Sequence, residues 1–88
     1  MPQPDSPLTF PARFPIKVMG RDAPEFRAAV VEIVARHAGG RERLEIETRP
    51  SRGGNFVALT VTFEAVSRAQ VDAIYRELTA HELVLVAL

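Results

Sequence analysis

The feature that most constrains the fold is a strict alternation of side chains over residues 56–64. Successive side chains of a β-strand point to opposite faces, so this pattern predicts a strand with one buried face. The buried set is apolar throughout: Val57, Leu59, Val61 and Phe63. The second face would carry Phe56, Ala58, Thr60 and Thr62. The sequence therefore requires a sheet that other elements cover on one side.

Two segments with helical spacing supply that cover. The first begins at Ala23-Pro24, since proline suits the first helical position, and ends at Gly39-Gly40. The second begins with Ser67 and Gln70, which form a capping box. Each carries one apolar stripe at i, i+3 or i+4 spacing. The stripes are Phe26, Val30, Ile33, Val34 and His37, and then Val71, Ile74, Tyr75 and Leu78.

Three more strands complete the order. Residues 14–20 alternate and stop at Gly20. Residues 43–49 carry mixed charges on one face, which is typical of an exposed edge strand. A turn-rich segment, residues 50–55, joins this strand to the next as a hairpin. Residues 83–88 are continuously apolar, so we expect a strand covered on both faces.

The resulting order, β-α-β-β-α-β, predicts a ferredoxin-like α+β sandwich with a four-stranded antiparallel sheet. Both helices should cover the same face, because each has only one apolar stripe. The opposite face would then be open and would carry an interaction surface. We predict for that surface Lys17, Met19, Phe56 and Thr60.

Length and composition limit the organisation of the chain. Its 88 residues make one domain, which we place at residues 10–88 after a flexible, proline-rich tail at residues 1–9. There are no cysteines, so neither disulfides nor thiolate metal sites support the small core. Small cores are often stabilised by partners, and we therefore expect a homodimer.

Charge and hydropathy limit the classes of partner. The formal net charge is zero, whereas nucleic-acid-binding domains usually carry a basic surplus, so no nucleic-acid partner is expected. No secretory pattern opens the chain, and no apolar run approaches the roughly 18 residues that span a bilayer. The sequence thus predicts a cytoplasmic protein without a membrane partner.

The sequence offers little for catalysis. His37 and His81 are the only histidines, and neither belongs to a cluster with metal-ligand spacing. Ser6, Ser51 and Ser67 have the contexts of tail, turn and helix-cap residues. We therefore predict no catalytic residues, no metal, no cofactor and no enzyme activity.

One candidate ligand site lies between the first strand and the first helix, at Gly20, Arg21 and Asp22. Backbone N–H groups at a helix start, together with an Arg, suit a carboxylate or phosphate. The alternative is a tight turn with a solvated Arg. A second segment with two interpretations is the hairpin, where Arg49 and Arg52 flank Gly53-Gly54 as either a basic finger or a solubilising turn.

Several motifs resemble those of the YbeD-like bacterial proteins of unknown function. The most specific is F-P-x-x-F-x-x-K-x-M-G, running from Phe10 to Gly20. Further pieces lie at residues 30–34, 36–38, 50–55 and 75–78, and Gly54 is an extra residue relative to the family pattern. The resemblance implies a ferredoxin-like fold similar to ACT-type regulatory domains, which bind small effectors at dimer interfaces. It also implies an association with lipoate assembly, and it places Gly20 at the ACT-type effector position.

These observations predict a non-catalytic regulatory domain that binds a small-molecule effector near Gly20 and Arg21. The alternative is an adaptor that binds a protein partner through the open sheet face.

Overall fold

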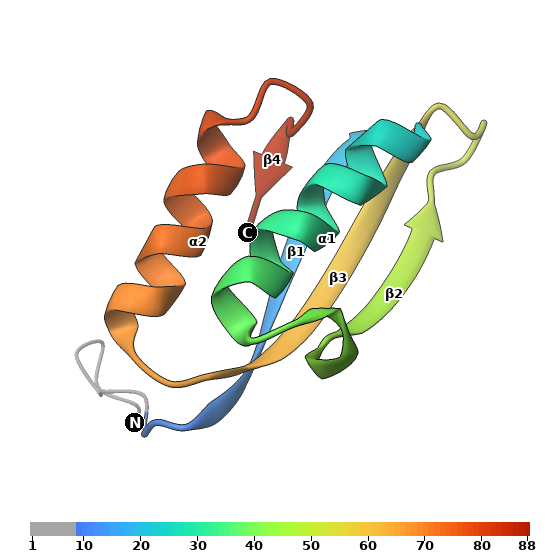
Figure 1. Ribbon diagram of the computed structural model, residues 1–88. Helices are drawn as coiled ribbons and strands as arrows, with labels where there is room; N and C mark the ends of the chain where they lie inside the picture. The colour runs from blue at the N-terminus through green and yellow to red at the C-terminus, as the bar shows by residue number, and fades with distance from the viewer. Residues whose placement is uncertain (1–8) are drawn as a thin grey trace, which may run out of the picture.

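Four strands and two α-helices follow one another in the order that the sequence predicts, with an additional short 3-10 helix before the second strand (Figure 1). The computed structural model describes residues 9–88. The strands form one antiparallel sheet in the order β2-β3-β1-β4, which confirms the ferredoxin-like fold. The elements are β1 (Ala12–Arg21), α1 (Pro24–Ala38), the short 3-10 helix η1 (Arg41–Arg43), β2 (Glu45–Pro50), β3 (Phe56–Ala65), α2 (Arg68–Ala80) and β4 (Val86–Ala87). The predicted tail falls outside the described residues, apart from exposed Thr9.

Both helices cover the same face of the sheet, as Figure 1 shows, and the core fills the space between. The alternation that predicted β3 is present in its burial, because every second residue from Val57 to Ala65 is buried. The stripes of the helices meet this face. The most deeply buried large side chains are Phe26, Phe63, Ile16, Leu59, Ile74, Leu78, Val18, Val30, Val34, Val57 and Val61. No helix among residues 9–88 is long and apolar enough to cross a membrane.

The helix ends use the predicted capping residues. Ala23 is the N-cap of α1 in an extended conformation, and Pro24 follows it as the first helical residue. Gly39 ends the helix at φ +94°, a left-handed conformation that glycine adopts with little strain. At α2, the Ser67 hydroxyl accepts from the Gln70 N–H at 3.0 Å. The Gln70 side-chain oxygen accepts from the Val66 N–H at 2.7 Å. These bonds satisfy backbone donors that the first turn of a helix leaves free.

The prediction for the last strand is wrong in its cover and its length. β4 has only two residues, Val86–Ala87, and it lies at the edge of the sheet. Leu85 and Leu88 are 59% and 64% exposed. The apolar run has a different cause: Leu83, Val84 and Ala87 pack against the core, whereas Val86 and Leu88 lie on the side without helices. One helical layer buries only one side of a strand.

Two other boundaries shift by one or two residues. β1 runs from Ala12 to Arg21, so it does not stop at Gly20. β2 begins at Glu45 because residues 41–43 form the 3-10 turn. All six residues of β2 are exposed at the sheet edge, as the mixed charges predicted.

Pro15 lies on the edge of β1 that faces away from β3. β1 pairs with β3 along its whole length but with β4 only at residues 17–19. The Lys17 N–H donates to the Leu88 carbonyl at 3.1 Å, and the Leu88 N–H donates to the Lys17 carbonyl at 2.8 Å. Since alternate residues direct their backbone groups to the same side, Pro15 also faces this side. Pro15 has no N–H, so it offers no donor there.

Candidate functional site

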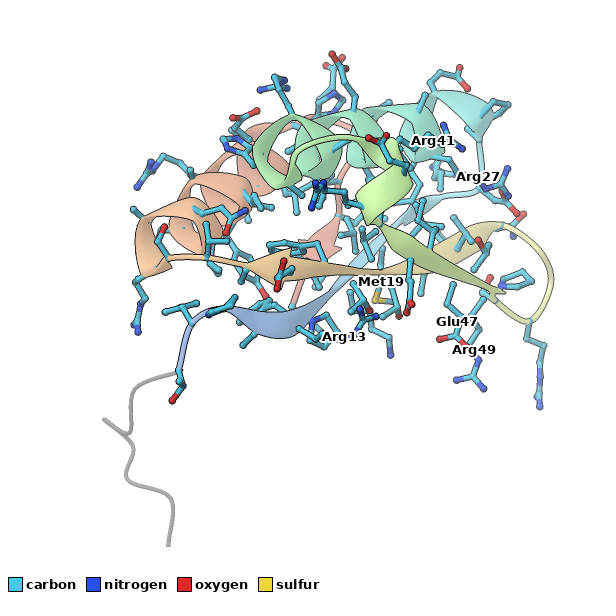
Figure 2. All side chains as sticks on the ribbon, turned by 60° about the horizontal axis from the view of Figure 1, so that its bottom comes forward. Arg13, Met19, Arg27, Arg41, Glu47 and Arg49 are labelled. Atoms are coloured by element: carbon cyan, nitrogen blue, oxygen red, sulfur yellow. The ribbon has the colours of Figure 1, made fainter. Side chains whose placement is uncertain are left out.

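The face of the sheet away from the helices, which we call the open face, holds all four residues of the predicted interaction surface. Lys17, Met19, Phe56 and Thr60 occupy the alternate positions of β1 and β3 that the helices leave uncovered. Figure 2 shows Arg13, Met19, Glu47 and Arg49 on the side of the sheet opposite to the helices. The strand pairing adds Arg21, Glu45, Ala58, Thr62, Glu64, Val86 and Leu88 to the same face.

A groove of about 390 Å³ runs along β3 on the open face. Its floor is made by the short side chains of Ala58 and Thr60. Longer side chains stand on each side, Lys17 from β1 and Glu47 and Arg49 from β2. The groove exists because β3 places small residues here while both neighbouring strands place long ones.

Charge on the open face is divided between strands. β1 contributes three cations, Arg13, Lys17 and Arg21, whereas the carboxylates of Glu45 and Glu47 lie on β2. Glu64 on β3 pairs in register with Arg13. Arg13 forms an ion pair with Glu45, but both side chains are well exposed, so the pair adds little stability. The open face is therefore close to neutral: β1 carries only cations, and β2, on the other side of β3, carries two carboxylates and Arg49.

Apolar side chains are also exposed on this face. Met19 and Phe56 are 37% and 39% exposed, and Val86 is 42% exposed. Leu88 extends this set along the edge beside Lys17. A large apolar surface left in contact with water is a common mark of a binding site.

The candidate ligand residues Gly20, Arg21 and Asp22 do not form one site. A Cβ at Gly20 would lie 2.5 Å from the Phe26 ring and 2.7 Å from the Leu83 carbonyl, so this glycine allows close packing. Asp22 is ion-paired with Arg27. The Arg21 guanidinium lies 5.5 Å from the centroid of the Phe56 ring, its partner in the strand register. Arg21 thus joins the open face.

A small, mainly apolar cavity does lie beside the first turn of α1. Its volume is about 240 Å³. Phe26 and Ala23 line it from the helix, Leu83 and Leu85 line it from the loop before β4, and Arg21, Glu25 and Glu82 add charge. This is the region where the sequence predicts an effector, although Gly20 and Asp22 are not among the lining residues.

The two histidines have structural contacts. The His37 ring lies 2.6 Å from the Glu77 carboxylate, which also accepts from Arg36 at 2.8 Å, so the three side chains connect α1 to α2. The His81 Nδ1 accepts from the Leu83 N–H at 3.1 Å. Within residues 9–88 there is no group of three potential metal-ligating side chains.

The contacts of the Glu77 carboxyl should make the stability of the protein depend on pH under acidic conditions. Hydrogen bonds from His37 and Arg36 lower the pKa of Glu77 below its usual 4.5. A carboxylate with a lowered folded-state pKa stabilises the protein above its unfolded pKa, and this contribution is lost as the pH falls through the folded pKa.

We therefore expect urea unfolding to show stability falling with pH below about 4.5 more steeply in the natural protein than in Glu77→Gln. Glu32→Gln, at an exposed position on α1, is the matched control and should follow the natural protein. Equal slopes for the natural protein and Glu77→Gln would contradict this assignment.

Sequence reasoning did not find the β2 side of the groove. It recognised Glu45, Glu47 and Arg49 as one charged face but did not place them beside Lys17. The missing information was the strand register, which aligns Glu47, Thr60 and Lys17 across three strands. It likewise separated Arg21 from Phe56, which the register makes direct neighbours.

Comparisons with known proteins agree with the sequence motifs. A family model described as "Protein of unknown function (DUF493)" matches residues 5–88. The UPF0250 protein of Paraburkholderia phymatum is 46% identical over 84 residues, covering 96% of this chain and 94% of that protein. The UPF0250 protein of Bordetella pertussis is 42% identical over 88 residues, covering 100% and 97%.

A solved structure shows the same fold. The solution structure of protein HP0495 from H. pylori matches with a TM-score of 0.70 and 17% identity, covering 100% of this chain and 94% of that one. At this identity the match concerns the fold alone. Together with the family match, these findings show that the chain belongs to the DUF493 family, the YbeD-like bacterial proteins whose motifs its sequence carries.

Proposed function

We propose that this protein is a non-catalytic binding domain that recognises a protein partner through the open face. The observation that carries the proposal is the groove over Ala58 and Thr60 with exposed Met19 and Phe56 beside it. Exposed apolar side chains surrounded by charged ones match the apolar core and polar rim of a protein interface.

The proposal is tested by capture experiments with tagged variants in a lysate of the source bacterium. Met19→Glu and Phe56→Glu place a charge on the exposed apolar part of the open face, and we expect each to lose every specifically bound protein. Glu32→Lys and Arg76→Glu, at exposed positions on the two helices, are the matched controls and should retain them. Unchanged capture by the open-face variants would contradict the proposal. Lipoate-assembly enzymes among the lost proteins would support the association that the family resemblance implies.

A second candidate is the regulatory role, with a small effector in the cavity beside α1. The lining favours a ligand with an apolar part, for Phe26, Leu83 and Leu85, and a charged group that Arg21 or the two glutamates would bind. Thermal-shift measurements with amino acids and carboxylates test it. A ligand at 100 times its Kd adds about 2.7 kcal/mol, which should raise the Tm of so small a domain by about 10 °C or more.

The variant Leu85→Glu tests whether the ligand occupies this cavity. Leu85 is 59% exposed, so its replacement should leave the fold intact. The ligand should then no longer raise the Tm of this variant. If no amino acid or carboxylate at millimolar concentration raises the Tm, the effector role is wrong.

A further inference from the structure

We propose that the partner bound by the open face is a second copy of this chain, packed sheet to sheet about a two-fold axis parallel to the strands. This inference rests on the proposed function, because it names the partner of the same face. The evidence is the shape and the charge of that face, which complement themselves.

The shape argument starts from the groove along β3. The groove floor at Ala58 and Thr60 is low, and the next strand, β1, carries a ridge that includes Lys17 and Met19. A two-fold axis between β1 and β3 places the ridge of each copy over the groove of the other. Sheets pack at about 10 Å with interdigitated side chains, so a ridge over small residues is the arrangement that fills the space.

The strand register decides which residues meet. A two-fold axis parallel to the strands preserves position along the strand, so a residue of one copy meets the same row of the other. Glu47, Thr60 and Lys17 form one such row. Lys17 of each copy then lies over Thr60 of the other, next to the Glu47 of that copy. In the adjacent row, Met19 lies over Ala58.

The charges favour this partner over others. In this arrangement Lys17 of one copy lies near Glu47 of the other, and Arg13 lies over Glu64 of the other, so a second copy supplies carboxylates for two cations of the open face. A nucleic acid would meet Glu45 and Glu47 in the same face as Lys17, which is unfavourable for a polyanion. An isologous contact repeats each complementary pair twice, which is how two-fold dimers are formed.

The size of the face sets the expected strength. Its strands have ten, six, ten and two residues. At about 16 Å² of sheet for each residue this is roughly 450 Å² in projection, below the about 800 Å² that each partner of a standard interface buries. Because side chains project from the sheet, the area that each copy buries is larger than this projected area. We expect a dimer that dissociates in the micromolar range.

The experiment is a charge exchange between two variants, with mass measured by light scattering and sedimentation equilibrium from about 1 µM to 1 mM. The natural chain should pass from 9.7 kDa to twice that mass as concentration rises. Lys17→Glu alone places Glu opposite Glu47, and Glu47→Lys alone places Lys opposite Lys17. Each should weaken the dimer about 10- to 100-fold.

An equimolar mixture of the two variants should restore the dimer, because both cross-copy contacts then join opposite charges. Glu32→Lys and Arg76→Glu carry the same changes in net charge on the helices, and each should dimerise like the natural chain. Circular dichroism of every variant confirms folding.

A natural chain that stays monomeric to 1 mM overturns this inference, as does a dimer that neither charge reversal weakens. If the chain is monomeric and the open face still captures a different protein, only the choice of partner is wrong. If Met19→Glu and Phe56→Glu change neither self-association nor capture, the proposed function fails as well.

Discussion

Replacing Phe63 by alanine should remove about 3–5 kcal/mol from the free energy of unfolding. Phe63 lies near the C-terminal end of β3 and is completely buried, with its ring 6.0 Å from that of Phe14. Truncation removes apolar contacts and leaves a cavity that the surrounding side chains fill only in part. A domain of 88 residues has a total stability of about 4–13 kcal/mol, so this single change removes a large fraction of it.

Urea unfolding followed by circular dichroism measures the effect. Phe56→Ala is the matched control, since Phe56 is on the same strand but 39% exposed on the open face. It should cost less than about 1 kcal/mol. Equal losses at the two positions would mean that the helices do not cover the face to which Phe63 belongs.

The substitution Gly20→Val is expected to cost about 3 kcal/mol or more, and Gly20→Ala about 1–3 kcal/mol. The added Cβ would lie 2.5 and 2.6 Å from two carbons of the Phe26 ring and 2.7 Å from the Leu83 carbonyl oxygen. Phe26 is buried, and the carbonyl belongs to the backbone, so neither moves cheaply. Backbone conformation is not the cause, because Gly20 is not among the glycines with positive φ.

A double-mutant cycle separates crowding from other effects. Phe26→Leu shortens the side chain that Gly20→Ala meets, so the two changes together should cost less than their sum by about 0.5–3 kcal/mol. Ala58→Val adds methyl groups at a half-buried position on the open face and should change stability by less than about 0.5 kcal/mol. Strict additivity at Gly20 and Phe26 would contradict the packing role.

The order of elements and the covered face followed from the sequence because they depend on local pattern. The alternation around Val57 and Leu59 and the stripes through Val30 and Ile74 each require one buried side, and only one arrangement of two helices satisfies them all. Capping is equally local, so Ser67 was assigned correctly.

The last strand and the groove could not be predicted in the same way. A continuous apolar run such as residues 83–88 has no period, so it does not say how many sides are covered. The contacts of Arg21 with Phe56, and the alignment of Glu47 with Lys17, depend on pairing between segments far apart in sequence. Hydrophobic pattern fixes the face of a residue, whereas its neighbours across the sheet follow from register.

Pro15 has a consequence for the way copies of this chain assemble. A strand that approached the first half of β1 from this side would find no N–H donor at Pro15, which makes this edge a poor template for pairing with another strand. The dimer that we propose uses the open face instead, where a two-fold contact closes on itself and leaves no equivalent surface for a third copy.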